Sequence, residues 1–164
     1  MILYHGGSVA IEKPQVASPL RNRPLDFGSG FYTTTSLEQA KRWVALRRDQ
    51  DLDFGPGVVS RYHFDQSAFF DRNLRVLKFS RDDLSPWFYF VMSNRHIKSY
   101  SHNYDLVIGP VANDKVFVTL TMFEQGIIDK FMAIQQLKTF VLWDQYLFHT
   151  EQALKYLKFS GIEG

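Results

Sequence analysis

Apolar and polar side chains alternate along several short stretches of this chain, as they do in half-buried β-strands. Between residues 58 and 64 the sequence Val-Val-Ser-Arg-Tyr-His-Phe places Val58, Ser60, Tyr62 and Phe64 on one face and the residues between them on the other. A period of two residues matches a strand whose successive side chains point to opposite faces of a sheet. Alternation, or a short β-branched or apolar run, predicts strands at residues 1–4, 31–34, 58–64, 74–79, 106–108 and 145–149.

Other stretches carry apolar side chains three and four residues apart, which predicts helices. In the clearest of these, Ala40, Trp43 and Val44 share one face of a helix that begins near Leu37 and ends near Arg48. Hydroxyl side chains precede three of the expected helices and can cap their first turns: Thr35 or Ser36, Ser85 followed by Pro86, and Thr150. Helices are predicted at residues 37–48, 86–95, 113–125 and 127–137, with a short one after residue 150. This mixture of strands and helices indicates the α+β class.

Composition limits the classes of protein that remain. The chain has 164 residues, a formal net charge of +2 and no cysteine. One domain over residues 1–164 is expected at this length, and the charge is too small to indicate nucleic-acid binding by itself. Without cysteine there are no disulfides, thiolate nucleophiles or cysteine-based zinc sites. The sequence shows neither a signal peptide nor an uninterrupted apolar run of ~18 residues, so we expect a cytoplasmic protein without a membrane span.

The stretch from residue 26 to residue 43 combines a glycine turn, a strand and a helix. The turn Gly28-Ser29-Gly30 allows the backbone to take φ > 0 or to approach a ligand closely. Tyr32 stands just before the expected helix and Trp43 about a turn and a half into it, so both are predicted to border one pocket. The alternative is that both are core aromatic residues beside a glycine turn.

Three short motifs occur in the order found in a known clan of enzymes. Residues 3–7, Leu-Tyr-His-Gly-Gly, resemble the His-Gly strand end of poly(ADP-ribose) polymerases and diphtheria-toxin-like ADP-ribosyltransferases. Residues 27–32, Phe-Gly-Ser-Gly-Phe-Tyr, resemble their Phe-Gly-x-Gly-x-Tyr element. Residues 144–148 resemble their last conserved strand, in which an acidic residue normally stands in place of Gln145. The full pattern, with the Gly-Pro-x-Ala-Asn-Asp segment at 109–114, is similar to a bacterial family of domains of unknown function within this clan.

The resemblance implies a split antiparallel β-sheet core with short peripheral helices, and NAD as the substrate. By that resemblance, the Gly6 backbone would bind the carboxamide of nicotinamide, and a ring nitrogen of His5 would bind the adenosine ribose. Tyr32 would stack on the nicotinamide ring, with Trp43 as the opposite wall. The polymerases carry a serine on the following helix that also binds the carboxamide. Gln39 or its neighbour at position 40 matches that place, and Gln39 can serve through its amide.

The third motif departs most from the clan. A carboxylate at this place can bind the nicotinamide ribose, stabilise positive charge and help to activate an acceptor, whereas Gln145 can only form hydrogen bonds. Polymer elongation is therefore not expected, and transfer of one ADP-ribose unit is. Glu151 and Asp114 are candidates for a replacement carboxylate. Their ordinary roles would be a helix-dipole partner and a helix or turn cap, respectively.

The remaining polar residues fit ordinary roles or the NAD hypothesis. The histidines outside the motifs are His63, His96, His102 and His149. They lack metal-ligand spacing, so no metal site is expected, and no Gly-x-Ser-x-Gly elbow indicates a hydrolase. Arg21 and Arg23 lie in the loop between the first two motifs, where their forked donors could reach the pyrophosphate of NAD.

The resemblance therefore predicts a mono-ADP-ribosyltransferase that uses NAD to modify a macromolecular acceptor, either protein or nucleic acid. Its closest biological contexts are a bacterial toxin or defence effector, and a toxin would imply a neutralising antitoxin protein. Two alternatives remain at this stage. One is a catalytically silent module that binds NAD or ADP-ribose, and the other is an NAD glycohydrolase.

Overall fold

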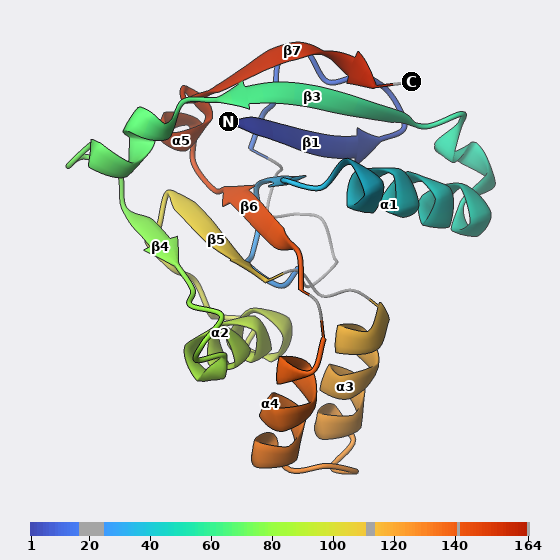
Figure 1. Ribbon diagram of the computed structural model, residues 1–164, viewed down its shortest axis with the longest axis vertical. Coiled ribbons are helices and arrows are strands. Elements are labelled where there is room, and N and C mark those ends of the chain that lie inside the picture. Colours follow the sequence, from blue (N-terminus) through green and yellow to red (C-terminus); the bar gives the residue numbers. More distant parts are fainter. Residues whose placement is uncertain (17–24, 111–113, 141, 164) are drawn as a thin grey trace.

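A seven-stranded sheet dominates the part of the chain that the computed structural model describes, residues 1–16, 25–110, 114–140 and 142–163 (Figure 1). The strands are β1 (Ile2–Gly7), β2 (Phe31–Thr34), β3 (Val58–Phe64), β4 (Val76–Lys78), β5 (Leu106–Pro110), β6 (Asp144–Phe148) and β7 (Leu157–Glu163). The α-helices are α1 (Leu37–Gln50), α2 (Ser85–His96), α3 (Asp114–Glu124), α4 (Lys130–Lys138) and α5 (Glu151–Leu154). Short 3₁₀ helices follow α1 at Leu52–Phe54 and β3 at Gln66–Phe70.

The sheet is mixed, which corrects the expectation of an antiparallel core. Its order is β4-β5-β6-β2-β1-β3-β7, and β4 pairs with β5 in parallel while the other recorded pairs are antiparallel. The connection from β4 to β5 contains α2. Parallel neighbours need such a long crossover, whereas antiparallel neighbours can be joined by a tight turn. The α+β class is confirmed.

The sheet divides between β1 and β2. These strands share one registered pair, Tyr4 with Thr34. By contrast, β1 pairs with β3 along its whole length, from Ile2 to Gly7, and β2 pairs with β6 along its whole length. In Figure 1 the half formed by β1, β3 and β7 runs across the top, and β4, β5 and β6 run diagonally below it. The motif residues of β1 and β2 therefore lie where the two halves part.

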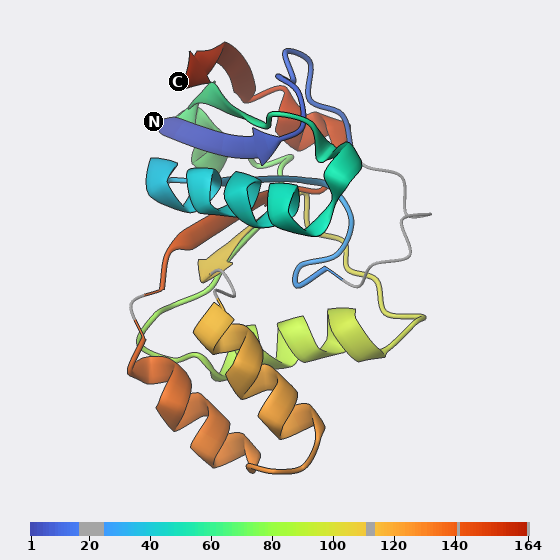
Figure 2. The same cartoon turned by 90° about the vertical axis from the view of Figure 1, so that its right-hand side faces the viewer.

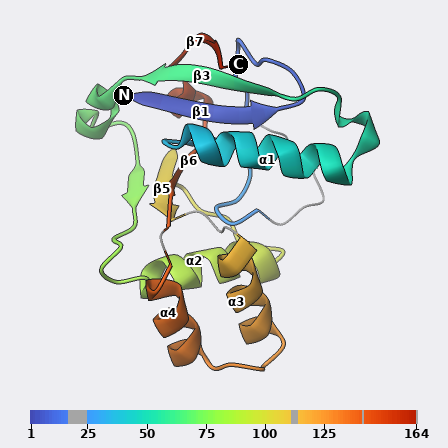
Figure 3. The ribbon, with the colours of Figure 1, turned by 45° about the vertical axis from the view of Figure 1, so that its right-hand side comes forward.

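Helices cover the sheet unevenly. Helix α1 lies alongside β1 and packs on it through Ala40 and Val44, which contact Val59 of β3 (Figure 3). Helix α2 covers the lower half, and Figure 2 shows α3 and α4 side by side beyond it. The core below contains Phe27, Trp87, Phe88, Val107, Leu120, Leu137 and Leu147. The opposite face of the sheet buries Leu3, Phe31, Tyr62, Phe64, Ile108, Tyr146 and Phe148.

Most predicted elements are present, with three informative differences. The Ser36 side chain caps α1 by accepting a hydrogen bond from the Gln39 amide at 3.1 Å, which confirms one of the two predicted caps. The predicted cap at Ser85 is wrong, because Ser85 is the first residue of α2 and its own amide donates to Asp83 at 3.0 Å. Strand β7 was not predicted, since only its first residue, Leu157, is buried. Strand β1 continues through Gly6 and Gly7, whereas the predicted strand ended at residue 4.

Candidate functional site

The three predicted motifs meet at the junction of the two sheet halves. His5 lies on β1, Tyr32 on β2 and Gln145 on β6, and β2 is the strand between the other two. Thr34 of β2 is paired with Gln145 on one side and with Tyr4, the neighbour of His5, on the other. Residues more than a hundred positions apart in the sequence are thus brought to adjacent strands.

The His5 side chain bonds to the β2 backbone next to the single registered pair of β1 and β2, Tyr4 with Thr34. Its Nδ1 lies 2.7 Å from the carbonyl oxygen of Tyr32. A carbonyl oxygen only accepts, so Nδ1 carries the proton and Nε2 of the neutral ring is an acceptor. Burial lowers the pKa of His5, more than the hydrogen bond to Tyr32 raises it. The ring also stacks on Phe31, with centroids 4.4 Å apart, so the neutral imidazole is held in one orientation.

Tyr32 is tied to the glycine turn through its hydroxyl group. The hydroxyl donates to the Gly28 carbonyl at 2.6 Å and accepts from the Phe27 amide at 3.1 Å. Burial raises the pKa of Tyr32, so the phenol does not serve as a proton donor or acceptor in the physiological range. Gly28 and Gly30 have φ values of 90° and 143°, as the turn prediction required. Tyr32 therefore offers a fixed ring rather than a reactive hydroxyl.

Gln145 is the most unusual residue of the junction. Only 7% of its surface is exposed, and it lies between Thr34 of β2 and Gly109 of β5. Its buried amide nitrogen makes no hydrogen bond within the described residues. Leaving a buried donor unpaired costs about 1–3 kcal/mol, and most buried polar groups in proteins have a partner. The structure thus holds a buried donor in place at a stability cost.

Thr34 connects Gln145 to the start of α1. Its hydroxyl accepts from the Ser36 amide at 3.1 Å and donates to Oε1 of Gln39 at 2.7 Å. Gln39 is consequently held toward β2, and within the described residues its amide nitrogen makes no hydrogen bond. Sequence analysis did not identify Thr34, because its role depends on the register between β2 and β6.

Helix α1 lies directly against Gly6. A Cβ atom at Gly6 would be 2.7 Å from the Ala40 carbonyl oxygen, 2.8 Å from Cγ2 of Val44 and 3.3 Å from Cε3 of Trp43. No side chain fits there, so Gly6 allows α1 to approach β1 closely. Trp43 is 45% exposed and contacts the ring of Phe54 at 5.9 Å. Trp43 therefore lies beside Gly6, whereas its place opposite Tyr32 across a bound ring stays a prediction.

The side chains reach the junction from both faces of the sheet. Tyr32 is paired with Leu147 and Thr34 with Gln145, so Tyr32 and Gln145 point to the same face. Diagonal neighbours of this kind are roughly 7–8 Å apart. His5 stacks on Phe31, which faces the other side, and meets Tyr32 through its backbone carbonyl. A ligand that touches all three must lie along the edge where β1 and β2 part.

Of the other predicted site residues, only Glu151 has a described side chain, and it lies away from this junction. Glu151 begins α5, beyond the end of β6 that is farther from Gln145, and its exposed carboxylate accepts from the Val16 amide at 3.2 Å. Residues Arg21 and Arg23 lie outside the described residues. Asp114 is the first residue of α3, and its side chain is likewise outside the described part.

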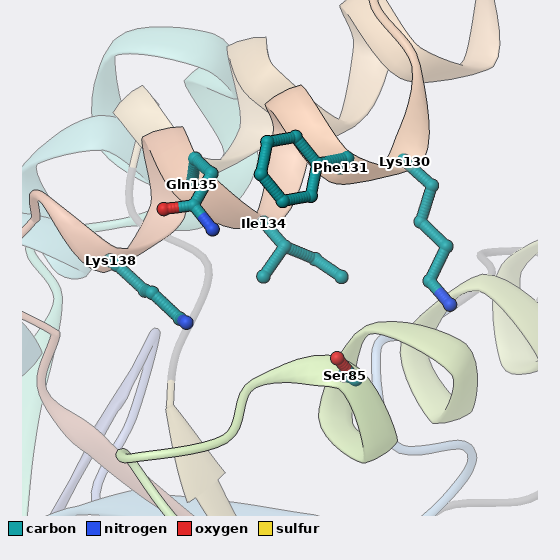
Figure 4. Close-up of a pocket in the computed structure, with 6 residues that line it drawn as sticks. All are labelled: Ser85, Lys130, Phe131, Ile134, Gln135 and Lys138. Atoms are coloured by element: carbon teal, nitrogen blue, oxygen red, sulfur yellow. The ribbon is translucent and has the colours of Figure 1, made fainter.

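Two surface hollows lie elsewhere. One groove of about 330 Å³ lies between Ser85 of α2 and the side chains of Phe131, Ile134 and Lys138 on α4 (Figure 4). Another, of about 220 Å³, lies between α1 and the start of β3. Neither is lined by His5, Tyr32 or Gln145. Among the described residues no group of three or more His, Asp or Glu side chains could hold a metal ion. The junction is therefore defined by its hydrogen-bonding groups.

Fold and junction together define an α+β protein with a divided mixed sheet and a polar site at the division. Residues 1–159 match the family described as "Protein of unknown function (DUF3990)", and the chain belongs to that family. No curated protein matches it. None of the helices in the described residues has the length and apolar character needed to cross a membrane. Membership of a family of unknown function was predicted; its link to the ADP-ribosyltransferase clan stays a prediction.

Proposed function

We propose that the protein transfers a single ADP-ribose unit from NAD to a macromolecular acceptor, with the junction of β1, β2 and β6 as the reaction site. The observation that carries the proposal is the buried Gln145 amide, which has an unpaired donor at the position where the clan carries its acidic residue. Most buried polar groups in folded proteins have a hydrogen-bond partner, so an unpaired one calls for an explanation. The donor suits a hydroxyl oxygen of the nicotinamide ribose.

The reaction requires orientation more than proton transfer. The bond between the nicotinamide nitrogen and C1′ of its ribose breaks, and the nitrogen keeps the electron pair, so neutral nicotinamide leaves. The ribose becomes oxocarbenium-like, as in glycoside hydrolysis. A lone pair of the acceptor then forms the new bond to C1′, and the proton of the acceptor passes to solvent. A neutral amide that fixes the ribose can contribute by orientation alone.

Neighbouring groups support this assignment. Nε2 of His5 is an acceptor in a neutral ring, which suits a hydroxyl group of the second ribose. Trp43 lies beside Gly6, whose backbone would bind the carboxamide. Gln39 is oriented by Thr34 and keeps an amide nitrogen for the same carboxamide. Tyr32 supplies a ring whose hydroxyl is fixed, as stacking on a flat ligand requires.

A silent NAD-binding module is the second candidate. Its supporting observation is that neither Gln145 nor the tied hydroxyl of Tyr32 can act as a base. Hydrolysis of NAD, with water as the acceptor, remains the third. A role as a toxin or defence effector, with an antitoxin partner, is proposed by analogy with the clan alone.

The test measures nicotinamide released from NAD, with and without cell extract as a source of acceptor. Gln145→Ala is expected to reduce release roughly 10- to 100-fold, because the hydrogen bond that orients the ribose is lost. Gln145→Glu is expected to retain or increase release. Gln136→Ala, on the exposed face of α4, is the matched control and should behave as wild type.

The products separate the three functions. Label transferred from NAD to a macromolecule supports transfer, free ADP-ribose alone supports hydrolysis, and calorimetric binding without turnover supports the silent module. Failure of the wild-type protein to bind NAD would contradict all three.

A further inference from the structure

The turn before β2 has a side-chain donor on each of three consecutive backbone carbonyls. Nε2 of His102 lies 2.8 Å from the Phe27 carbonyl oxygen, and Nδ1 of His149 lies 2.6 Å from that of Ser29. Between them, the Tyr32 hydroxyl donates to the Gly28 carbonyl. The donors come from three separate places: the segment before β5, strand β2 itself and the residue after β6. A turn of three residues is thus fixed from three directions.

Both histidines have a defined tautomer. A carbonyl oxygen only accepts, so Nε2 of His102 and Nδ1 of His149 carry protons. The Tyr104 amide also donates to Nδ1 of His102 at 3.3 Å, which keeps that nitrogen as an acceptor. The two rings lie 4.4 Å apart at an angle of 40°. Each ring therefore restricts the other as well as the turn.

The fixed turn determines the position of Tyr32. The Tyr32 hydroxyl donates to the Gly28 carbonyl, which lies between the two carbonyls that the histidines hold, and accepts from the Phe27 amide. The end of the turn at Gly30 packs closely against the residues at the end of β6. A Cβ atom at Gly30 would be 2.4 Å from the Phe148 carbonyl oxygen and 3.1 Å from Cα of His149. Movement of the turn would therefore move the ring of Tyr32.

We propose that His102 and His149 are positioning residues of the site: they hold the turn and, through it, the ring of Tyr32. This inference deepens the proposed function and rests on it only for the consequence in NAD binding. Neither histidine is a catalytic residue, since the ring nitrogens that carry protons are engaged by backbone carbonyls. Their role is to maintain the ring of Tyr32 in the orientation that stacking requires.

The experiment compares substitutions that remove each donor with substitutions that replace it. His102→Leu and His149→Leu remove the donors. His102→Gln places an amide donor near Nε2, and His149→Asn places one near Nδ1. His96→Leu is the control, because His96 bonds to Glu124 at 3.0 Å and does not touch the turn. Two quantities are measured: the NMR exchange rate of the Phe27 amide without NAD, and the NAD dissociation constant by calorimetry.

We expect each leucine variant to speed exchange of the Phe27 amide at least about 10-fold, since one hydrogen bond of the turn is lost. The same variants should weaken NAD binding by a similar factor. Gln and Asn should restore both quantities toward wild type, and His96→Leu should change neither. Unchanged Phe27 exchange in folded leucine variants would overturn the proposal, and so would faster exchange with unchanged NAD affinity.

One readout depends neither on NAD nor on the leucine variants. In NMR spectra of the wild-type protein, the proton should be on Nε2 of His102 and on Nδ1 of His149. The opposite tautomers would overturn the proposal even if the leucine variants do not fold. If wild-type protein binds no NAD, the proposed function fails, and so does the expected effect of the histidines on NAD binding. Exchange of the Phe27 amide then still decides whether the histidines hold the turn.

Discussion

At the scale of single residues, the hydroxyl and the ring of Tyr32 have different expected roles, which substitutions can separate. The hydroxyl forms hydrogen bonds within the turn, and the ring is expected to contact the ligand. Tyr32→Phe removes the hydroxyl and leaves the Gly28 carbonyl and the Phe27 amide without it, which should lower the free energy of unfolding by about 1–3 kcal/mol. The ring remains, so the NAD dissociation constant should rise only a few-fold. Tyr32→Leu should lower stability similarly and also abolish stacking. Urea unfolding and calorimetric titration measure the two effects.

Tyr62→Phe is the matched control for this experiment. The Tyr62 hydroxyl donates to the Ile11 carbonyl at 2.6 Å, away from Tyr32 on the opposite face of the sheet. Its loss should destabilise the protein without changing NAD affinity. If Tyr32→Leu binds NAD as tightly as wild type, the ring of Tyr32 does not contact the ligand.

Sequence analysis could nominate candidate site residues but not predict their hydrogen bonding. The motif order was enough to single out His5, Tyr32 and Gln145, and the structure places them on neighbouring strands at one junction. That the Gln145 amide is unpaired, and that Thr34 lies opposite it, follows from strand register, which depends on contacts between distant segments. His102 has no local signal for its role, because its partner is 75 residues away.

At the scale of elements, local patterns located the strands and long-range pairing determined how they join. The alternation from Val58 to Phe64 predicted β3 with its observed bounds. Strand β7 has one buried residue and a glycine at 161 with φ of 135°, so its sequence lacks a clear strand pattern. The strand is defined by its pairing with β3. The parallel pairing of β4 with β5 is likewise not indicated by any periodic pattern in the sequence.

One buried carboxylate joins three elements. Asp105, which is 3% exposed, accepts two hydrogen bonds from the Arg75 side chain, one from the Arg75 amide and one from the Thr150 hydroxyl. It thereby connects the starts of β4, β5 and α5. Asp105→Ala should lower the free energy of unfolding by about 3 kcal/mol or more, because several donors lose their acceptor together. Equilibrium unfolding in urea measures the loss.

A surface ion pair provides the comparison. Arg81 and Asp144 are 3.0 Å apart with side chains 52% and 34% exposed. Arg81→Ala should cost roughly 0.2–1 kcal/mol, as exposed pairs do. Equal effects of Asp105→Ala and Arg81→Ala would contradict the structural role assigned to Asp105.

At the scale of the whole molecule, two histidines at the junction couple folding to pH. Burial lowers the pKa of His5, and burial together with the nearby His149 lowers the pKa of His102. In the unfolded chain both titrate near the ordinary value of about 6.5. Below that pH the unfolded state binds more protons than the folded state, so stability decreases as the pH falls. Above it, neither histidine contributes to a pH dependence.

The free energy of unfolding should therefore fall between pH 7 and pH 5, by up to about 1.4 kcal/mol per pH unit for each extra proton bound by the unfolded chain. His5→Asn and His102→Gln keep the donor to the carbonyl but cannot take up a proton, so each should flatten the slope. His63→Gln, on the exposed face of β3, should not. Burial raises the pKa of Asp26 despite Arg95, which acts in the opposite direction, so slopes are compared among variants in urea titrations. Equal slopes in all of them would show that neither His5 nor His102 is kept neutral by the fold.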